Sequence, residues 1–185
     1  MTSVAPGTPG TPAVTGRTLV AGVGNIFQRD DAFGVEVIRL LSGRPRPPGV
    51  EVADFGIRGV HLVYELLGGC DLFVLVDAAQ RGCAPGTVTV LEVEPEDMAE
   101  RGRVMDAHGL APDQVFAMLA AMGSRPGRSL VVACEPADVS PGMGLSDQVR
   151  QALPLAVRAV EEIIEQSSQA REVEREEGAD DEVAD

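Results

Sequence analysis

The chain has 185 residues, no tryptophan and a formal net charge of −14. Hydrophobic residues make up 44% of the sequence and aromatic residues only 3%, which is compatible with one globular domain whose core is built from aliphatic side chains. So acidic a chain is a poor candidate for binding nucleic acid or an anionic membrane, because both require a basic face. A protein or a small ligand is therefore the expected partner.

The cysteine pattern and the absence of sorting signals suggest a reducing compartment. Cys70, Cys83 and Cys134 are scattered without CxxC spacing, which does not fit a disulfide framework. The N-terminus has neither the basic start nor the apolar run of a signal peptide, and no apolar run approaches the roughly 18 residues of a membrane helix. We expect a cytoplasmic monomer.

Composition divides the chain into three parts. Residues 1–16 are rich in Pro, Gly, Thr and Ala and read as a flexible leader. Residues 17–167 form the expected single α/β domain. Residues 168–185 read as an acidic disordered tail, in which 171–185 hold eight acidic residues against two arginines.

Short apolar runs alternate with helical patterns through the domain. Strands are predicted over residues 18–23, 50–53, 72–76, 87–93 and 130–134. Helices are predicted over residues 32–41, 60–67, 112–122 and from a cap at Ser146 toward Gln166. Pro154 should kink or split the last of these helices.

The alternation predicts an α/β three-layer sandwich. Strands that are apolar throughout favour a mostly parallel, twisted sheet of about five strands with helices on both faces. The strand over 87–93 follows its predecessor without a helix and is expected to be an antiparallel edge. In such sheets ligands bind beyond the carboxyl ends of the strands.

Polar residues follow the predicted strands at that edge. Asp31, Asp54 and Asp77 come after the first three strands, and His108 lies in the loop before the last one. Carboxylates converging with an imidazole would suit a divalent metal ion. Each residue also has a structural alternative: Asp30 or Asp31 could cap a helix, and Asp54 and Asp77 could end their strands.

Gly22-x-Gly24 partly matches a dinucleotide fingerprint, but Phe27 occupies the place of its third glycine. We interpret the two glycines as a tight turn that brings the backbone close to a bound group. A nucleotide-binding module remains an alternative. The G-x-S-x-G and H-E-x-x-H signatures of common hydrolases are absent from the sequence.

The string GVGNIFQRDDAFGVEVIRLL resembles the N-terminal signature of the nickel–iron hydrogenase maturation endopeptidases. The resemblance continues with Asp54 and Gly56, with VDA ending at Ala78, with a His-Gly-Leu loop at His108, and with EP…GMGLS over 135–146. It covers nearly the whole folded region in the right order. The DFGIRG loop departs from the family pattern, which usually carries D-G-G-T-x-G there.

The resemblance implies an endopeptidase that removes the C-terminal extension of a hydrogenase large-subunit precursor. It also implies that nickel, brought by the substrate and replaceable by another divalent metal, is the recognition element. Its ligands would be Asp31, Asp77 and His108, and the candidates for the catalytic group are Asp31, Asp77 and Asp54. The alternative from another class is a chaperone of the same fold that binds nickel or the precursor without cutting.

Overall fold

The computed structural model describes residues 16–94 and 112–182. Its strands are β1 (Thr18–Val23), β2 (Val50–Gly56), β3 (Leu72–Ala78), β4 (Val88–Val93) and β5 (Arg128–Cys134). Its helices are the short 3-10 helix η1 (Arg29–Ala32) and the α-helices α1 (Phe33–Ser42), α2 (Gly59–Leu67), α4 (Pro112–Ala121) and α5 (Asp147–Glu182). In the described ranges, none of these helices is long and apolar enough to cross a membrane.

The strands form one sheet in the order β2-β1-β3-β5-β4. β1 pairs in parallel with both β2 and β3, and β3 pairs in parallel with β5. β4 pairs antiparallel with β5, which confirms the predicted edge strand. The α/β class and the mostly parallel sheet are thus as the sequence predicts.

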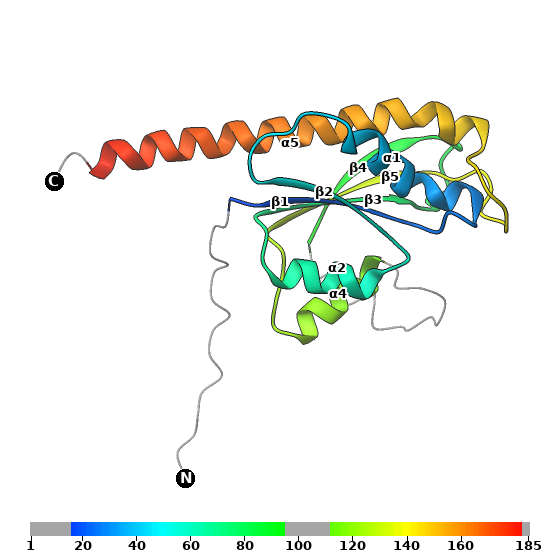
Figure 1. Cartoon of the computed structure of the whole chain (residues 1–185), viewed down its shortest axis with the longest axis horizontal. Helices are drawn as coiled ribbons and strands as arrows, with labels where there is room; N and C mark the ends of the chain where they lie inside the picture. Colours follow the sequence, from blue (N-terminus) through cyan, green and yellow to red (C-terminus); the bar gives the residue numbers. More distant parts are fainter. Residues whose placement is uncertain (1–15, 95–111, 183–185) are drawn as a thin grey trace, which may run out of the picture.

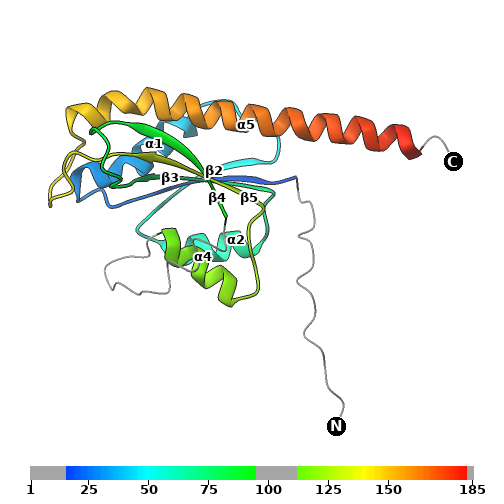
Figure 2. The ribbon, with the colours of Figure 1, turned by 180° about the vertical axis from the view of Figure 1, so that it is seen from behind.

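Helices cover both faces of the sheet (Figure 1). α1 and α5 lie on one face and α2 and α4 on the other, and the view from behind shows the same three layers (Figure 2). Alternate residues of the central strands belong to two separate hydrophobic cores, one on each face of the sheet. In β3, Val74 and Val76 pack toward α1 and α5, whereas Phe73 and Leu75 pack toward α2 and α4. A strand buried on both faces must be apolar throughout, which is why β3 reads as a continuous apolar run.

Two features of the elements differ from the sequence-based expectation. β2 continues past Ala53 to Gly56, so Asp54 lies inside the strand. α5 is one helix of 36 residues that runs through Pro154 and far beyond Gln166, and its end projects past the sheet (Figure 1). The predicted split at Pro154 is wrong: the proline is exposed, and the buried residues on either side of it hold the helix on the sheet.

Candidate active site

The sheet has its topological switch point between β1 and β3. From β1 the chain crosses by α1 to β2 on one side, and from β2 it returns by α2 to β3 on the other side of β1. In open α/β sheets ligands bind in the crevice outside the carboxyl ends of the strands at such a switch point. Asp31 follows β1, and Asp77 is the penultimate residue of β3.

Asp31 is half-buried in η1, and the loop that precedes it orients its carboxylate. The backbone N–H of Asn25 donates to Asp31 Oδ2 at 2.7 Å. The Asn25 side chain in turn accepts from the backbone N–H of Phe27 at 3.0 Å. Asn25 therefore positions the carboxylate of Asp31, which lies six residues later in the sequence. Within the described part of the chain, no hydrogen bond reaches Asp31 Oδ1.

Asp77 faces the same crevice from β3. Burial and, to a smaller extent, the negative charge of Asp31 together raise the pKa of Asp77 to about 8, while the backbone N–H of Ala78 partly opposes the shift. That N–H donates to Asp77 Oδ1 at 2.8 Å. The two carboxylates thus lie close enough for their charges to interact, and the arrangement favours either a proton on Asp77 or a bound cation.

Close backbone packing explains the glycines of the first loop. Gly24 has φ +131°, and a Cβ there would lie 1.8 Å from the Asp31 carbonyl oxygen. A Cβ on Gly34 would lie 2.2 Å from the Val76 carbonyl oxygen and 2.4 Å from that of Val23. In the described structure these glycines bring the loop and α1 against the protein's own backbone, which already accounts for glycine at these positions, and the approach of Gly22 and Gly24 to a bound group stays a prediction.

Asp30 does not cap a helix. The side chains at the N-termini of η1 and α1 make no capping hydrogen bond. The buried Asp30 carboxylate instead accepts hydrogen bonds from the loop after β5: from the backbone N–H groups of Ala137, Asp138 and Ser146 at 2.6–3.0 Å and from the Ser146 hydroxyl at 2.8 Å. Burial alone would raise the pKa of Asp30, but these four donors outweigh it and lower the pKa.

Glu135 holds the third loop of the site. Its carboxylate accepts from the backbone N–H groups of Arg81 (2.8 Å), Gly82 (3.3 Å) and Cys83 (3.2 Å), which follow β3. Its pKa is lowered, because these donors outweigh the opposing effect of burial. The loops after β1, β3 and β5 are therefore tied together by two buried carboxylates that point away from the crevice.

The remaining predicted residues are placed as follows. Asp54 pairs with Gly22 in the sheet register, so it lies at the same edge, one strand beyond β1, and its side chain is exposed. His108 lies outside the described residues. Over 16–94 and 112–182 no three His, Cys, Asp or Glu side chains gather closely enough to hold a metal ion. The described part of the site thus offers Asp31 and Asp77, two oxygen ligands that would bind a divalent metal only moderately on their own.

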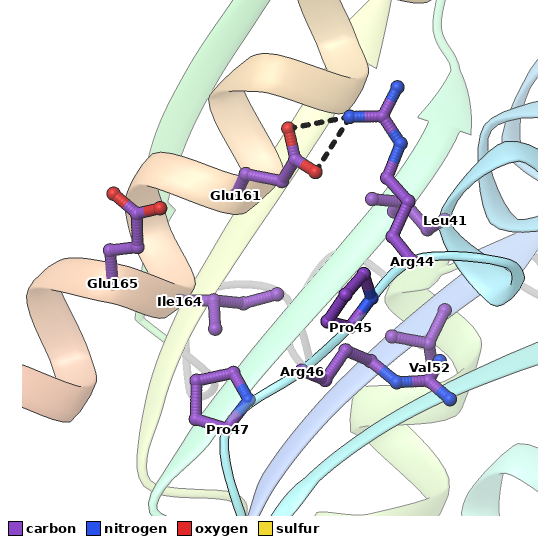
Figure 3. Close-up of a pocket in the computed structure, with 9 residues that line it drawn as sticks. All are labelled: Leu41, Arg44, Pro45, Arg46, Pro47, Val52, Glu161, Ile164 and Glu165. Atoms are coloured by element: carbon purple, nitrogen blue, oxygen red, sulfur yellow. Dashed lines mark hydrogen bonds and ion pairs between the residues drawn. The ribbon is translucent and has the colours of Figure 1, made fainter.

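A small pocket of about 80 Å³ lies at the opposite, amino edge of the sheet (Figure 3). It is lined by the end of α1, the loop before β2, and α5, and Arg44 crosses it to pair with Glu161 at 2.7 Å. The pocket has no carboxylate in common with the crevice, so it is separate from the candidate site.

The sequence pattern missed the structural roles of Asp30 and Glu135. The signals were present: two adjacent acids where only one can face the crevice, and an acid directly after the buried strand β5. The loop EPADVSPGMGLS that follows supplies the backbone donors for Asp30. Pairing that loop with the loop after β1 would have predicted the contact between Asp30 and Ser146.

The sequence matches the family described as hydrogenase maturation protease over residues 35–164. It is 33% identical over 141 residues to the hydrogenase expression/formation protein HupM of Azotobacter chroococcum, covering 75% of this chain and 67% of the relative. The fold is similar to the hydrogenase maturating endopeptidase HybD of Escherichia coli, with a TM-score of 0.69 and 28% identity over 82% of this chain and 93% of that one. It is also similar to the hydrogenase 2 maturation peptidase of a Thaumarchaeota archaeon, with a TM-score of 0.62 and 30% identity over 80% and 97% of the two chains.

Proposed function

Because the chain belongs to the hydrogenase maturation protease family, we propose that it removes the C-terminal extension of a [NiFe] hydrogenase large-subunit precursor that already carries nickel. The observation that carries the proposal is the pair of carboxylates, Asp31 and Asp77, at the switch point of the sheet. Asp31 follows β1 and Asp77 lies near the end of the neighbouring strand β3, close enough for their charges to interact, and each keeps one oxygen that no described residue reaches with a hydrogen bond. A cation that arrived with the substrate would take the place of the proton that Asp77 holds in the free protein and would be bound by both carboxylates.

Three residues of this chain would recognise the metal of the substrate. Asp31 and Asp77 would bind the substrate's nickel, and His108 is the proposed third ligand from this chain. Binding the metal would fix the adjacent peptide bond against the crevice, which lowers the entropy cost of the reaction. A site with few ligands of its own suits this task, since a site that kept a resident metal would not distinguish loaded from unloaded precursor.

Cleavage adds water across one peptide bond: the water oxygen bonds to the carbonyl carbon, the C–N bond breaks, and the departing amine gains a proton. Two groups could activate the water, the substrate's metal or a carboxylate of this chain. Asp54 is the candidate carboxylate, because it is exposed at the same edge and anchors no loop. An Asp54→Asn variant with lower kcat and unchanged KM would assign the proton transfer to Asp54, whereas unchanged kcat would assign it to the metal.

The test is the intact mass of a nickel-loaded cognate precursor after incubation with the protein. The wild-type chain should release a short C-terminal peptide, and Asp31→Asn, Asp77→Asn and His108→Ala should each lower the rate at least a hundredfold while the variants remain folded. Asp147→Asn, at an exposed position on α5, serves as the matched control. If the wild-type chain binds the precursor without changing its mass, while a family member cleaves it, the chain is a chaperone rather than a peptidase.

A further inference from the structure

Large apolar side chains stand exposed on three loops around the carboxylates. Ile26 and Phe27 are 42% and 61% exposed in the loop after β1, Ile57 is 69% exposed after β2, and Met143 is 72% exposed after β5. We call these four residues the apolar rim. Single exposed apolar residues are common on protein surfaces, but a group on adjacent loops at a site marks a contact surface.

Backbone hydrogen bonds hold the three loops side by side. The N–H of Gly142 donates to the Phe27 carbonyl at 2.8 Å, and the N–H of Arg29 donates back to the Gly142 carbonyl at 3.1 Å. On the other side, the N–H of Gly24 donates to the Gly56 carbonyl at 3.1 Å, next to Ile57. The rim is therefore fixed in place by the framework that holds Asp31.

The same framework includes a strained residue. Arg29 has φ +47°, a conformation that costs a non-glycine residue energy and persists only where its surroundings impose it. Its backbone bond to Gly142 and its ion pair with Asp138, at 3.2 Å, impose it here. Arg29 lies between Phe27 and Asp31 in the sequence, so the strained residue belongs to the segment that carries both.

Charge determines which occupant suits this surface. The chain carries a net charge of −14, and the rim surrounds Asp31 and Asp77. A second copy docked on this face would bring acidic sites together, whereas a partner that carries a metal cation beside an apolar segment would match both the centre and the rim.

We propose that the apolar rim binds an apolar stretch of the precursor polypeptide next to its metal-bearing end, on one or both sides of the scissile bond. This inference rests on the proposed function and adds the substrate chemistry that the site selects. Burial of Phe27 and Met143 would supply affinity, and the carboxylates would supply the dependence on metal.

The test compares a Phe27→Ser/Met143→Ser double variant with a Leu155→Ser control, because Leu155 is 54% exposed on α5 and is not one of the four residues of the rim. The probe is nickel-loaded precursor. Its binding is measured by titration, and its cleavage by initial rates. The double variant should raise Kd and KM at least tenfold and leave kcat within twofold, with an unchanged melting temperature; Leu155→Ser should match the wild type.

Three results separate the inference from the proposed function. Unchanged Kd and KM in the double variant would show that the rim does not bind the precursor, and would leave the proposed peptidase activity unaffected. Weaker binding of the double variant, with no cleavage even by the wild-type chain, would support the rim and overturn the proposed activity. Self-association of the wild-type chain that the double variant loses, with unaltered precursor affinity, would overturn the rim in favour of a second copy as its occupant.

Discussion

Asp77, a proposed ligand of the substrate's metal, is a residue that folding alone would not select. A buried carboxyl beside Asp31 gains nothing for the stability of the free protein. Its pKa of about 8 means that the folded chain holds a proton at neutral pH which the unfolded chain releases. Such a residue persists where a partner, here the proposed substrate metal, repays the cost on binding.

We expect Asp77→Asn to stabilise the metal-free protein increasingly as the pH rises from 5 to 8. In the unfolded chain an aspartate titrates near about 3.9, so between that value and about 8 the folded protein binds more protons. Its free energy of unfolding then falls with rising pH, by up to about 1.4 kcal/mol per unit, and asparagine removes this contribution. Urea unfolding at pH 5, 6, 7 and 8 measures the difference. A constant difference between the two proteins across this range would show that Asp77 is not protonated as described.

Asp30 is the opposite case, a carboxylate whose role is to hold structure. Asp30→Ala removes the acceptor for three backbone N–H groups and one hydroxyl, and should cost on the order of 2–4 kcal/mol of unfolding free energy. Asp147→Asn, which breaks an exposed pair with Arg150, should cost less than about 0.5 kcal/mol. Chemical denaturation measures the free energy of unfolding of both variants. Equally small losses in the two would show that Asp30 does not hold the loop after β5.

At the scale of elements, the first turn of α1 is wedged between β1 and β3. A methyl group on Gly34 would meet the carbonyl oxygens of both strands, so α1 and Asp31 would have to shift. Gly34→Ala should therefore destabilise the protein by about 1–3 kcal/mol. The shift of Asp31 should lower the cleavage rate beyond what the lost stability explains.

Gly43 at the other end of α1 provides the matched control. Its φ is −86° and a Cβ there would meet no atom within 4 Å, so Gly43→Ala should leave the stability unchanged or slightly raised. Melting temperatures and cleavage rates of the two variants are compared directly. Equal behaviour of Gly34→Ala and Gly43→Ala would contradict the tight packing of α1 on the strand ends.

The elements also show how far the sequence determines the structure. Continuous apolar strands, the antiparallel edge β4, the cap at Ser146 and the proline at the start of α4 follow from local patterns, and the structure confirms them. The contacts of Asp30 and Glu135 could not be predicted in the same way, because their partners lie 107–116 and 52–54 residues away. The length of α5 was missed because a proline and an acidic composition both argue locally against helix, and the packing of its first half on the sheet outweighs them.

At the scale of the whole molecule, the strand order accounts for the position of the site. The switch point between β1 and β3 brings together Asp31 and Asp77, which are far apart in the sequence, and the loops after β2 and β5 surround them. The strand-end rule predicted this edge from the sequence, and Asp31 and Asp77 lie there close enough for the charge of Asp31 to raise the pKa of Asp77, while their role as metal ligands stays a prediction. The assignment of His108 as the third ligand stays a prediction, as do the monomeric state and the domain boundaries.

We propose that cleavage depends on the nickel in the substrate and on no metal of the protein's own. The most direct test is to incubate the wild-type chain with the same precursor, loaded with nickel in one sample and free of it in the other, and to follow the intact mass of both. We expect loss of the C-terminal peptide from the loaded precursor alone. Cleavage of both precursors at the same rate would show that Asp31 and Asp77 do not recognise the substrate through its nickel.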